Sequence, residues 1–359
     1  SSTTSRSANY YANGTYKISD RFTSFTNVSY SRSYSDGHNP YFFQVPNYYV
    51  TGDPADAGTP SVYLARADQS TRNSRNNIFE AQQYFNGTFN LGSLRNRAVL
   101  GLDYTNIYSD QQFYSEDYID IVPTNVSGFD YSTFNGAFID HYYDTASDAL
   151  VQHYPYSSNT NIYSAFASDV LNITGNLELI AALRLDHFNN HDKASATSYN
   201  QTTLSPKFGL VYQPVKNQVS LFANYQNSFT NQGSYIAYDP DGTDGLASKF
   251  AKPEHANQWE AGIKTNLINN RLTATLSYYH IKVNDILRSD ERDPARAQIQ
   301  NGTQLSRGVE LEIISNPLKG FTVLGGVSYN DFSYENTSED ILGLRYSGAP
   351  WLANCWLSY

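Results

Sequence analysis

Large aromatic side chains gather in two long polar segments of this sequence, 36–72 and 108–156, where a ligand could be recognised. Tyrosine offers a large rigid face and a polar tip at little entropic cost, which suits a bulky, partly apolar ligand. The alternative is that these rings pack the segments onto one another. We expect two or three of the rings to touch ligand. The candidates are Phe43, Tyr48, Tyr114, Tyr118, Tyr142 and Tyr143.

Two arginines in these and similar segments, Arg66 and Arg288, could hold an anionic group on such a ligand. Guanidinium groups form strong, charge-assisted hydrogen bonds with carboxylates and phosphates. Acidic neighbours such as Asp68, Asp290 and Glu291 offer the alternative, which is a salt bridge within the chain.

Other chemistries find no support in the sequence. The net charge of −10 argues against a nucleic-acid partner, because no basic stripe neutralises phosphates. The seven histidines lack a paired metal spacing, and no serine, histidine and acid motif indicates a hydrolase. The aspartates of 238–245 miss the EF-hand spacing and predict a solvated turn. We therefore predict no catalytic residue, no metal site and no cofactor.

The elements that must position these residues are β-strands, because apolar and polar residues alternate with a period of two. In 306–313, for example, Val309 and Leu311 alternate with Glu310 and Glu312. Charged residues recur on the polar side of such runs, where a water-filled lumen would meet them. The predicted lumen-lining residues are Glu178, Arg184, Asp186, Glu260, Lys264, Glu310 and Glu312.

The connections between the strands alternate between short and long. Turn residues occur at 18–20, 92–93, 175–176, 216–217, 269–270 and 317–320, and long segments separate these turns. We count about thirteen strands of roughly ten or more residues, whereas soluble sandwiches have strands of ~5–6 residues. The rhythm is typical of a transmembrane β-barrel with short periplasmic turns, long extracellular loops and aromatic residues near the strand ends. The predicted fold is therefore all-β, an antiparallel transmembrane barrel.

Three stretches resemble the barrel of the TonB-dependent siderophore receptors. They are YSAFASDVLNITGNLELIAALRLDHF (163–188), SPKFGLVYQPVKNQVSLFANYQNSF (205–229) and KPEHANQWEAGIKTNLINNRLTATLSYYHIKVNDIL (252–287). SRGVELEI (306–313) and APWLANCWLSY (349–359) are similar to the next hairpin and strand of the family's barrel. The resemblance covers about residues 73–359 and implies a barrel of about 22 strands, filled by an N-terminal plug.

The resemblance also predicts how this chain departs from a whole receptor. We expect residues 1–359 to be a partial barrel, about 13 of the expected 22 strands, with the plug domain and the last strands absent. An incomplete sheet in lipid would leave backbone groups at its edges without partners.

The function implied by this resemblance is active transport, not enzymatic catalysis. We expect a protein of the bacterial outer membrane, in contact with lipid and lipopolysaccharide, that takes up a ferric siderophore and is opened by the TonB complex through the plug. The alternatives are a receptor for haem, cobalamin or a glycan, and a passive porin or adhesin barrel.

Overall fold

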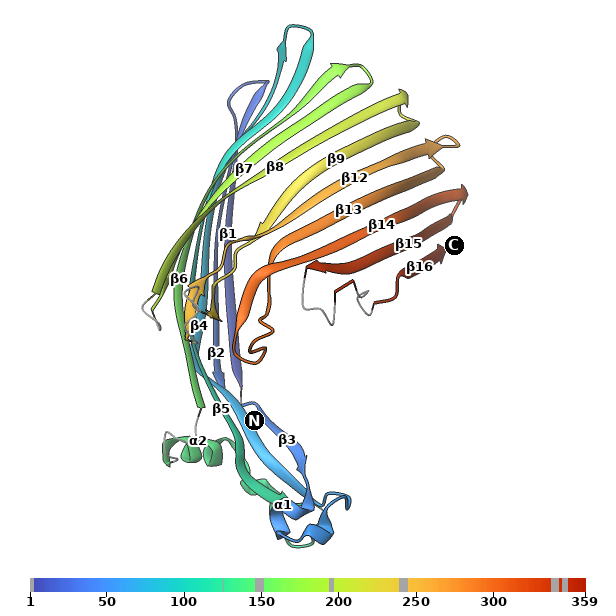
Figure 1. The fold of residues 1–359 in the computed structure, drawn as a ribbon. Helices are drawn as coiled ribbons and strands as arrows, with labels where there is room; N and C mark the ends of the chain where they lie inside the picture. The colour runs from blue at the N-terminus through green and yellow to red at the C-terminus, as the bar shows by residue number, and fades with distance from the viewer. Residues whose placement is uncertain are drawn as a thin grey trace.

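The chain folds into one long antiparallel sheet that curves into an open shell (Figure 1). The structure is a computed structural model and describes residues 3–124, 126–145, 152–193, 197–238, 245–336, 342–343 and 348–359. The main sheet runs in the order β1, β2, β4, β5, β6, β7, β8, β9, β12, β13, β14, β15 and β16. β3 pairs with β4, and β10 pairs with β11 in a small separate sheet.

The strands are β1 (Thr4–Lys17), β2 (Phe22–Gly37), β3 (Pro40–Val45), β4 (Tyr63–Leu91), β5 (Leu94–Pro123), β6 (Gln152–Thr174), β7 (Leu177–Asp192), β8 (Thr197–Val215), β9 (Val219–Thr230), β10 (Ser234–Tyr238), β11 (Leu246–Phe250), β12 (Glu254–Leu267), β13 (Leu272–Ser289), β14 (Gln298–Leu318), β15 (Phe321–Asn336) and β16 (Trp351–Ser358). The helices are α1 (Asn47–Thr51), α2 (Gly136–Thr145) and the 3-10 turns η1 (Pro54–Asp56) and η2 (Tyr131–Thr133). In the described part of the chain, no helix is long and apolar enough to cross a membrane.

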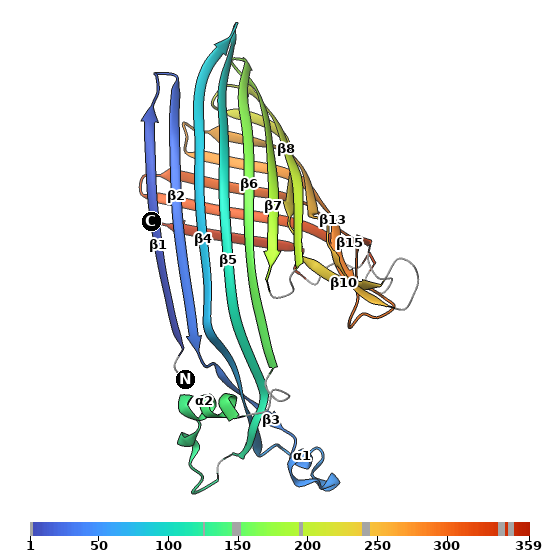
Figure 2. The ribbon, with the colours of Figure 1, turned by 90° about the vertical axis from the view of Figure 1, so that its left-hand side faces the viewer.

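The predicted all-β, antiparallel fold is confirmed, and so are the short turns. Each predicted turn joins two consecutive strands of the sheet, for example β4 to β5 and β14 to β15. Gly92 and Gly320 adopt φ values of 62° and 82° in these turns, a left-handed conformation that favours glycine. The described sheet stays open, with β1 at one edge and β16 at the other (Figure 2).

The expectation that 36–72 and 108–156 are long loops is wrong in part, because strands run into both segments. β4 has 29 residues and β5 has 30, so both continue far into segments that were expected to be loops. A membrane strand needs only ~9–11 residues. The long strands therefore form an extension beyond the membrane, at the end that carries β3, α1 and α2 (Figures 1 and 2).

The register divides the sheet into two faces. Asp103, Ser164 and Asp186 lie opposite one another across β5, β6 and β7, on what we call the inner face. Leu102, Ala165 and Leu185 form the adjacent row on the outer face, and Leu102 remains 63% exposed. Such an exposed apolar band suits contact with lipid.

Candidate functional site

The inner face carries a charged network centred on Arg184 of β7. Its Nη1 donates to Asp103 Oδ2 on β5 at 2.7 Å, and its Nε donates to both carboxylate oxygens of Asp186 at 3.0 and 3.1 Å. Ser164 on β6 donates to Asp186 at 2.5 Å. The network lines a hollow of about 800 Å³, to which β1, β2, β4, β5, β6, β7 and β9 contribute residues. Both polar side chains, such as Gln82 and Asp186, and apolar ones, such as Ile162 and Phe188, line this hollow.

A second inner-face group lies at the end of the sheet beyond the membrane. Tyr41 and Phe43 of β3 pair with Ala67 and Ala65 of β4. These two alanines lie on the same face of the sheet as Ser115 of β5. Ser115 in turn shares the inner face with Asp103 of the same strand. Phe43 meets Tyr118 edge to face, with ring centroids 5.2 Å apart. We call Tyr41, Phe43 and Tyr118 the inner aromatic group.

Tyr41 is held in place by a carboxylate. Its hydroxyl donates to Asp117 Oδ1 at 2.6 Å. This hydrogen bond, together with desolvation and the charge of Asp117, raises the pKa of Tyr41 to about 12. Tyr41 therefore stays neutral at physiological pH, and its ring stacks on that of Phe43 with centroids 6.3 Å apart.

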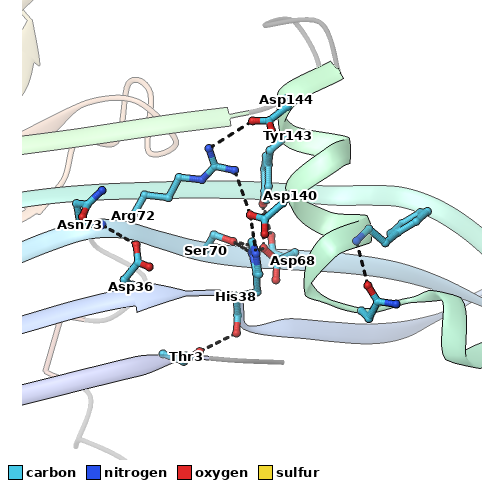
Figure 3. Close-up of polar contacts among 12 residues, drawn as sticks. Thr3, Asp36, His38, Asp68, Ser70, Arg72, Asn73, Asp140, Tyr143 and Asp144 are labelled. Carbon is cyan, nitrogen blue, oxygen red and sulfur yellow. Dashed lines mark hydrogen bonds and ion pairs between the residues drawn. The ribbon is translucent and has the colours of Figure 1, made fainter.

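A third group lies on the opposite, outer face, where α2 packs against β4 and β5 (Figure 3). β5 pairs with β6 without a register shift from Arg95 to Ser115, so Tyr114 shares the face of Leu102. Tyr114 and Tyr143 of α2 pack at 6.0 Å between centroids. The Arg72 guanidinium lies 5.3 Å from the Tyr114 ring and 5.2 Å from the Tyr143 ring.

Buried polar residues fasten α2 to this outer face. His38 Nδ1 lies 2.7 Å from Ser70 Oγ, and His38 Nε2 lies 3.1 Å from Asp140 Oδ1 on α2 (Figure 3). Ser70 also donates to Asp68, and the Tyr143 hydroxyl donates to Asp68 Oδ2 at 3.1 Å. Burial, and then the charge of Asp68, raise the pKa of Tyr143. The network anchors α2 to the outer face of the sheet.

Comparison with known proteins identifies the architecture. Residues 1–359 match the family model described as "TonB dependent receptor-like, beta-barrel". The chain belongs to this family. The barrel is therefore a bacterial outer-membrane barrel.

The relatives of this receptor barrel are siderophore and metallophore receptors by name. The metal-pseudopaline receptor CntO of Pseudomonas aeruginosa is 28% identical over 162 residues, which are 45% of this chain and 21% of the relative. The catecholate siderophore receptor Fiu of Escherichia coli is 22% identical over 296 residues, 74% of this chain and 37% of the relative. This chain thus spans well under half the length of these curated relatives.

A solved structure shows the same fold. The ferripyoverdine receptor of the outer membrane of Pseudomonas aeruginosa, bound to ferripyoverdine, superposes with a TM-score of 0.75 at 16% identity. The match covers 98% of this chain and 43% of that chain.

The predicted wall residues of the receptor barrel share the inner face. A row of cross-strand pairs runs from Glu178 through β8, β9, β12 and β13 to Glu310, so these two residues share a face. The other five predicted wall residues lie an even number of positions from this row and therefore on the same face: Arg184, Asp186, Glu260, Lys264 and Glu312. Glu178 accepts from Arg97 at 3.1 Å, and Glu260 accepts from Asn224 at 3.2 Å. Among the described residues, Lys264, Glu310 and Glu312 make no ion pair. Their role in lining a lumen stays a prediction.

The predicted ligand-binding residues are not brought together. Phe43 and Tyr118 lie on the inner face, whereas Tyr114, Tyr142 and Tyr143 belong to the α2 contact on the outer face. These positions correct the expectation of loop residues, since Phe43, Tyr114 and Tyr118 stand on strands and Tyr142 and Tyr143 on a helix.

The other predicted contacts lie elsewhere in the receptor barrel. Arg66, on β4, is 5% exposed, binds both carboxylate oxygens of Asp120 and carries the Phe134 ring 4.4 Å from its guanidinium. Tyr48, on α1, packs against Tyr49. Arg288, near the end of β13, donates to Asn301 Oδ1 at 2.7 Å and pairs with Glu291 at 3.4 Å. The salt-bridge alternative thus describes both arginines.

Sequence reasoning missed Tyr41, Asp103 and the α2 anchor. Asp103 alternates with Leu102 in the strand pattern, so the sequence could assign Asp103 to the polar face. Its ion pair with Arg184 could not be predicted in this way, because it joins residues 81 positions apart. The start of α2 has a local signal, because the Asn135 side chain accepts from the Phe138 backbone N–H at 3.1 Å.

The part of the chain that the structure describes shows no candidate metal site. No group of three or more histidine, cysteine, aspartate or glutamate side chains is placed to hold an ion there. The aspartates of 239–244, predicted to form a solvated turn, lie outside the described residues.

Proposed function

We propose that this chain is part of an outer-membrane receptor that imports a ferric siderophore in a TonB-dependent manner. The observation that carries the proposal is the inner face itself. An aromatic group stands above the membrane, and a polar, charged wall continues from it along the same face. A solute captured by the rings would meet the charged network of Arg184, Asp103 and Asp186 on the way down.

The chemistry of the inner aromatic group favours a large chelate. Tyr41, Phe43 and Tyr118 offer flat apolar surfaces with two phenolic hydroxyls, so they bury rings or alkyl chains while leaving polar groups partnered. The names of the relatives point the same way, because they include catecholate siderophore, ferrioxamine B and ferric-pyoverdine receptors.

The energy for transport has to come from outside this chain. We propose that a plug domain fills the lumen of the whole receptor and that the TonB complex acts on it. The wall residues Arg184, Asp186 and Glu260 would then face the plug or the passing chelate.

Uptake of radioactive iron by iron-starved cells that carry the full-length gene tests the function. We expect uptake with at least one member of a siderophore panel, and we expect it to vanish when TonB is inactivated. Unchanged iron uptake after deletion of the gene, across the whole panel, would overturn the iron assignment and leave haem, cobalamin or a glycan as substrate. Uptake that persists without TonB would indicate a passive porin.

Two matched variants then test the site. Phe43→Ala on the inner face should weaken binding of the transported siderophore by roughly tenfold, because a buried ring loses about 1.5 kcal/mol of contact. Tyr114→Ala on the outer face removes a ring of similar size and should leave the affinity unchanged. Equal effects of the two variants would refute the assignment of the ligand to the inner face.

A further inference from the structure

His38 lies in the connection between β2 and β3, and its side chain reaches both β4 and α2 (Figure 3). Nδ1 of the ring lies 2.7 Å from Ser70 Oγ, and Nε2 lies 3.1 Å from Asp140 Oδ1. His38 is 6% exposed and Ser70 is 0% exposed, so water has little access to the contact at Nδ1. The protonation state of the ring therefore has to fit these two partners.

The two partners require both ring nitrogens of His38 to donate a hydrogen bond. Asp140 lies on the surface of α2 with its side chain 60% exposed, and an ionised carboxylate can only accept. Ser70 has a single hydroxyl proton, which it donates to Asp68. The Ser70 oxygen is therefore left to accept from Nδ1. A ring that donates from both nitrogens is the imidazolium cation.

Neither neutral form of His38 completes the same network. A ring that is protonated at Nδ1 alone turns a lone pair toward the Asp140 carboxylate. A ring that is protonated at Nε2 alone needs the hydroxyl proton of Ser70, which Asp68 then loses. Asp68 is 0% exposed, and its Oδ1 already lacks a hydrogen bond in the described part of the structure. Because a buried carboxylate that loses a donor is destabilising, the network is complete only with the extra proton.

Acidic groups surround the buried side of His38. Asp68 Oδ2 lies 3.6 Å from Nδ1. Asp68 also pairs across the sheet with Glu116 of β5, which is 8% exposed and has one buried oxygen without a hydrogen bond to any described residue. Arg66, two residues before Asp68 on β4, is bound to both oxygens of Asp120. A positive charge on His38 therefore offsets part of the negative charge that is buried here.

The helix α2 adds two carboxylates and a neutral ring on the other side of His38. Asp140 and Asp144 lie 3.8 and 3.9 Å from the terminal nitrogens of Arg72, which is longer than a hydrogen bond. Tyr143 stacks on the His38 ring with centroids 6.4 Å apart, and its raised pKa keeps it neutral. One arginine thus faces two carboxylates of α2, which leaves Asp140 available to a charged His38.

Other titratable groups in this region have surroundings of their own. Asp36 of β2 accepts from the Asn73 backbone N–H at 3.0 Å. His153 Nε2 lies 2.9 Å from Gln112 Oε1, and His141 is exposed on α2. Of the histidines in the described part of the chain, His38 is the one with hydrogen bonds to both β4 and α2.

We propose that docking of α2 against the sheet takes up a proton at His38, so that the helix is held more tightly in acid than in alkali. The docked helix then holds one proton more than the released helix, and the docking equilibrium falls by up to about tenfold per pH unit as the pH rises. Histidine side chains change their charge between about pH 5 and 8, which sets the range of the effect. Ile139 of α2, 1% exposed, and the packing of Tyr143 on Tyr114 hold the helix at any pH, so its release is graded.

Hydrogen exchange of the backbone amides of 136–145, in the full-length receptor in detergent, measures the release of α2. After correction for the intrinsic pH dependence of amide exchange, we expect the protection of wild type to fall by roughly tenfold between about pH 6 and 8. His38→Gln removes the titrating ring and should leave the corrected protection nearly independent of pH.

Asp140→Asn gives a sharper test, because Asp140 is exposed and lies outside the buried part of the network. The amide of asparagine can donate to Nε2, so a neutral ring then completes the network and docking no longer needs a proton. The pH dependence should disappear while α2 stays protected. The matched control is Asp144→Asn, which removes a carboxylate 3.9 Å from Arg72 and should keep the full pH dependence.

Three results would overturn the proposal. The first is a protection of wild type that is constant or rises between pH 6 and 8. The second is a pH dependence that persists in His38→Gln or in Asp140→Asn, which would place the proton on another group such as His141 or His153. The third is an equal loss of the pH dependence in Asp140→Asn and Asp144→Asn, which would show a general attraction to Arg72 in place of a proton on His38.

Discussion

Replacing Arg184 by methionine should destabilise the barrel more than the same change at Arg97. Both arginines lie on the inner face and bind carboxylates, but their partners differ in burial. Arg184 is 41% exposed and contacts Asp103 and Asp186, whose side chains are 15% and 4% exposed. Arg97 is 45% exposed and contacts Glu178, which is 36% exposed. Both variants lose one cation, but only Arg184→Met leaves buried carboxylates without a partner. The difference between the two losses of stability therefore measures the effect of that burial.

The magnitudes follow from solvation. Breaking a fully buried ion pair costs about 3–5 kcal/mol, because one charge remains without a partner in a poorly solvated place. Arg184 is partly exposed and water screens part of this cost, so we expect Arg184→Met to lower the free energy of unfolding by about 2–3 kcal/mol. Arg97→Met breaks a surface pair and should cost less than about 1 kcal/mol.

Urea unfolding of the full-length receptor in phospholipid vesicles, followed by tryptophan fluorescence, measures both losses. A third variant isolates the cause. Arg184→Met combined with Asp103→Asn and Asp186→Asn removes the stranded charges and should recover more than half of the lost stability. Equal losses for Arg184→Met and Arg97→Met, or no recovery in the triple variant, would refute the reasoning.

Two further outcomes are expected. Gly308→Ala should prevent correct folding, because the added Cβ would overlap the Tyr329 carbonyl oxygen. Gly325→Ala on the adjacent strand meets nothing closer than 3.9 Å and should fold normally. The fraction of heat-shifted barrel in outer membranes measures the difference. Arg292 hydrogen-bonds Asp290 and lowers its pKa to about 2, so the stability that this carboxylate contributes is present above pH ~4 and is lost as the pH falls through 2. In Arg292→Gln the loss should begin nearer pH 4, and hydrogen exchange of the amides of 290–297 should show the earlier opening; an unchanged profile would contradict the pairing.

Much of the fold could be predicted because its signals are local. The alternation of Glu310 and Glu312 with Val309 and Leu311 sets the two faces of β14, and Gly92 and Gly320 mark turns where a left-handed residue is needed. Lipid on one side of the membrane-spanning sheet and water on the other enforce a strict period of two, so the faces of its strands can be assigned residue by residue.

The extension beyond the membrane could not be predicted in this way, since water surrounds both of its faces. Tyr114 and Tyr118 are four residues apart and would share a face in a regular strand. A register shift between Arg66 and Asp68 sets a single β4 residue against three of β5, and Tyr118 instead packs with Phe43. Such an irregularity depends on contacts between distant segments, and so does the anchoring of α2 through His38.

The extension formed by β3, β4 and β5 exposes two different surfaces, one on each face of the same strands. Side chains that face inward, such as Phe43, and those that face outward, such as Tyr114 against α2, can be substituted separately. Because neighbouring residues point in opposite directions, a substitution on one surface alters the other only through the shared backbone. Substitutions on the outer surface of the extension can therefore accumulate without changing the side chains of its inner surface.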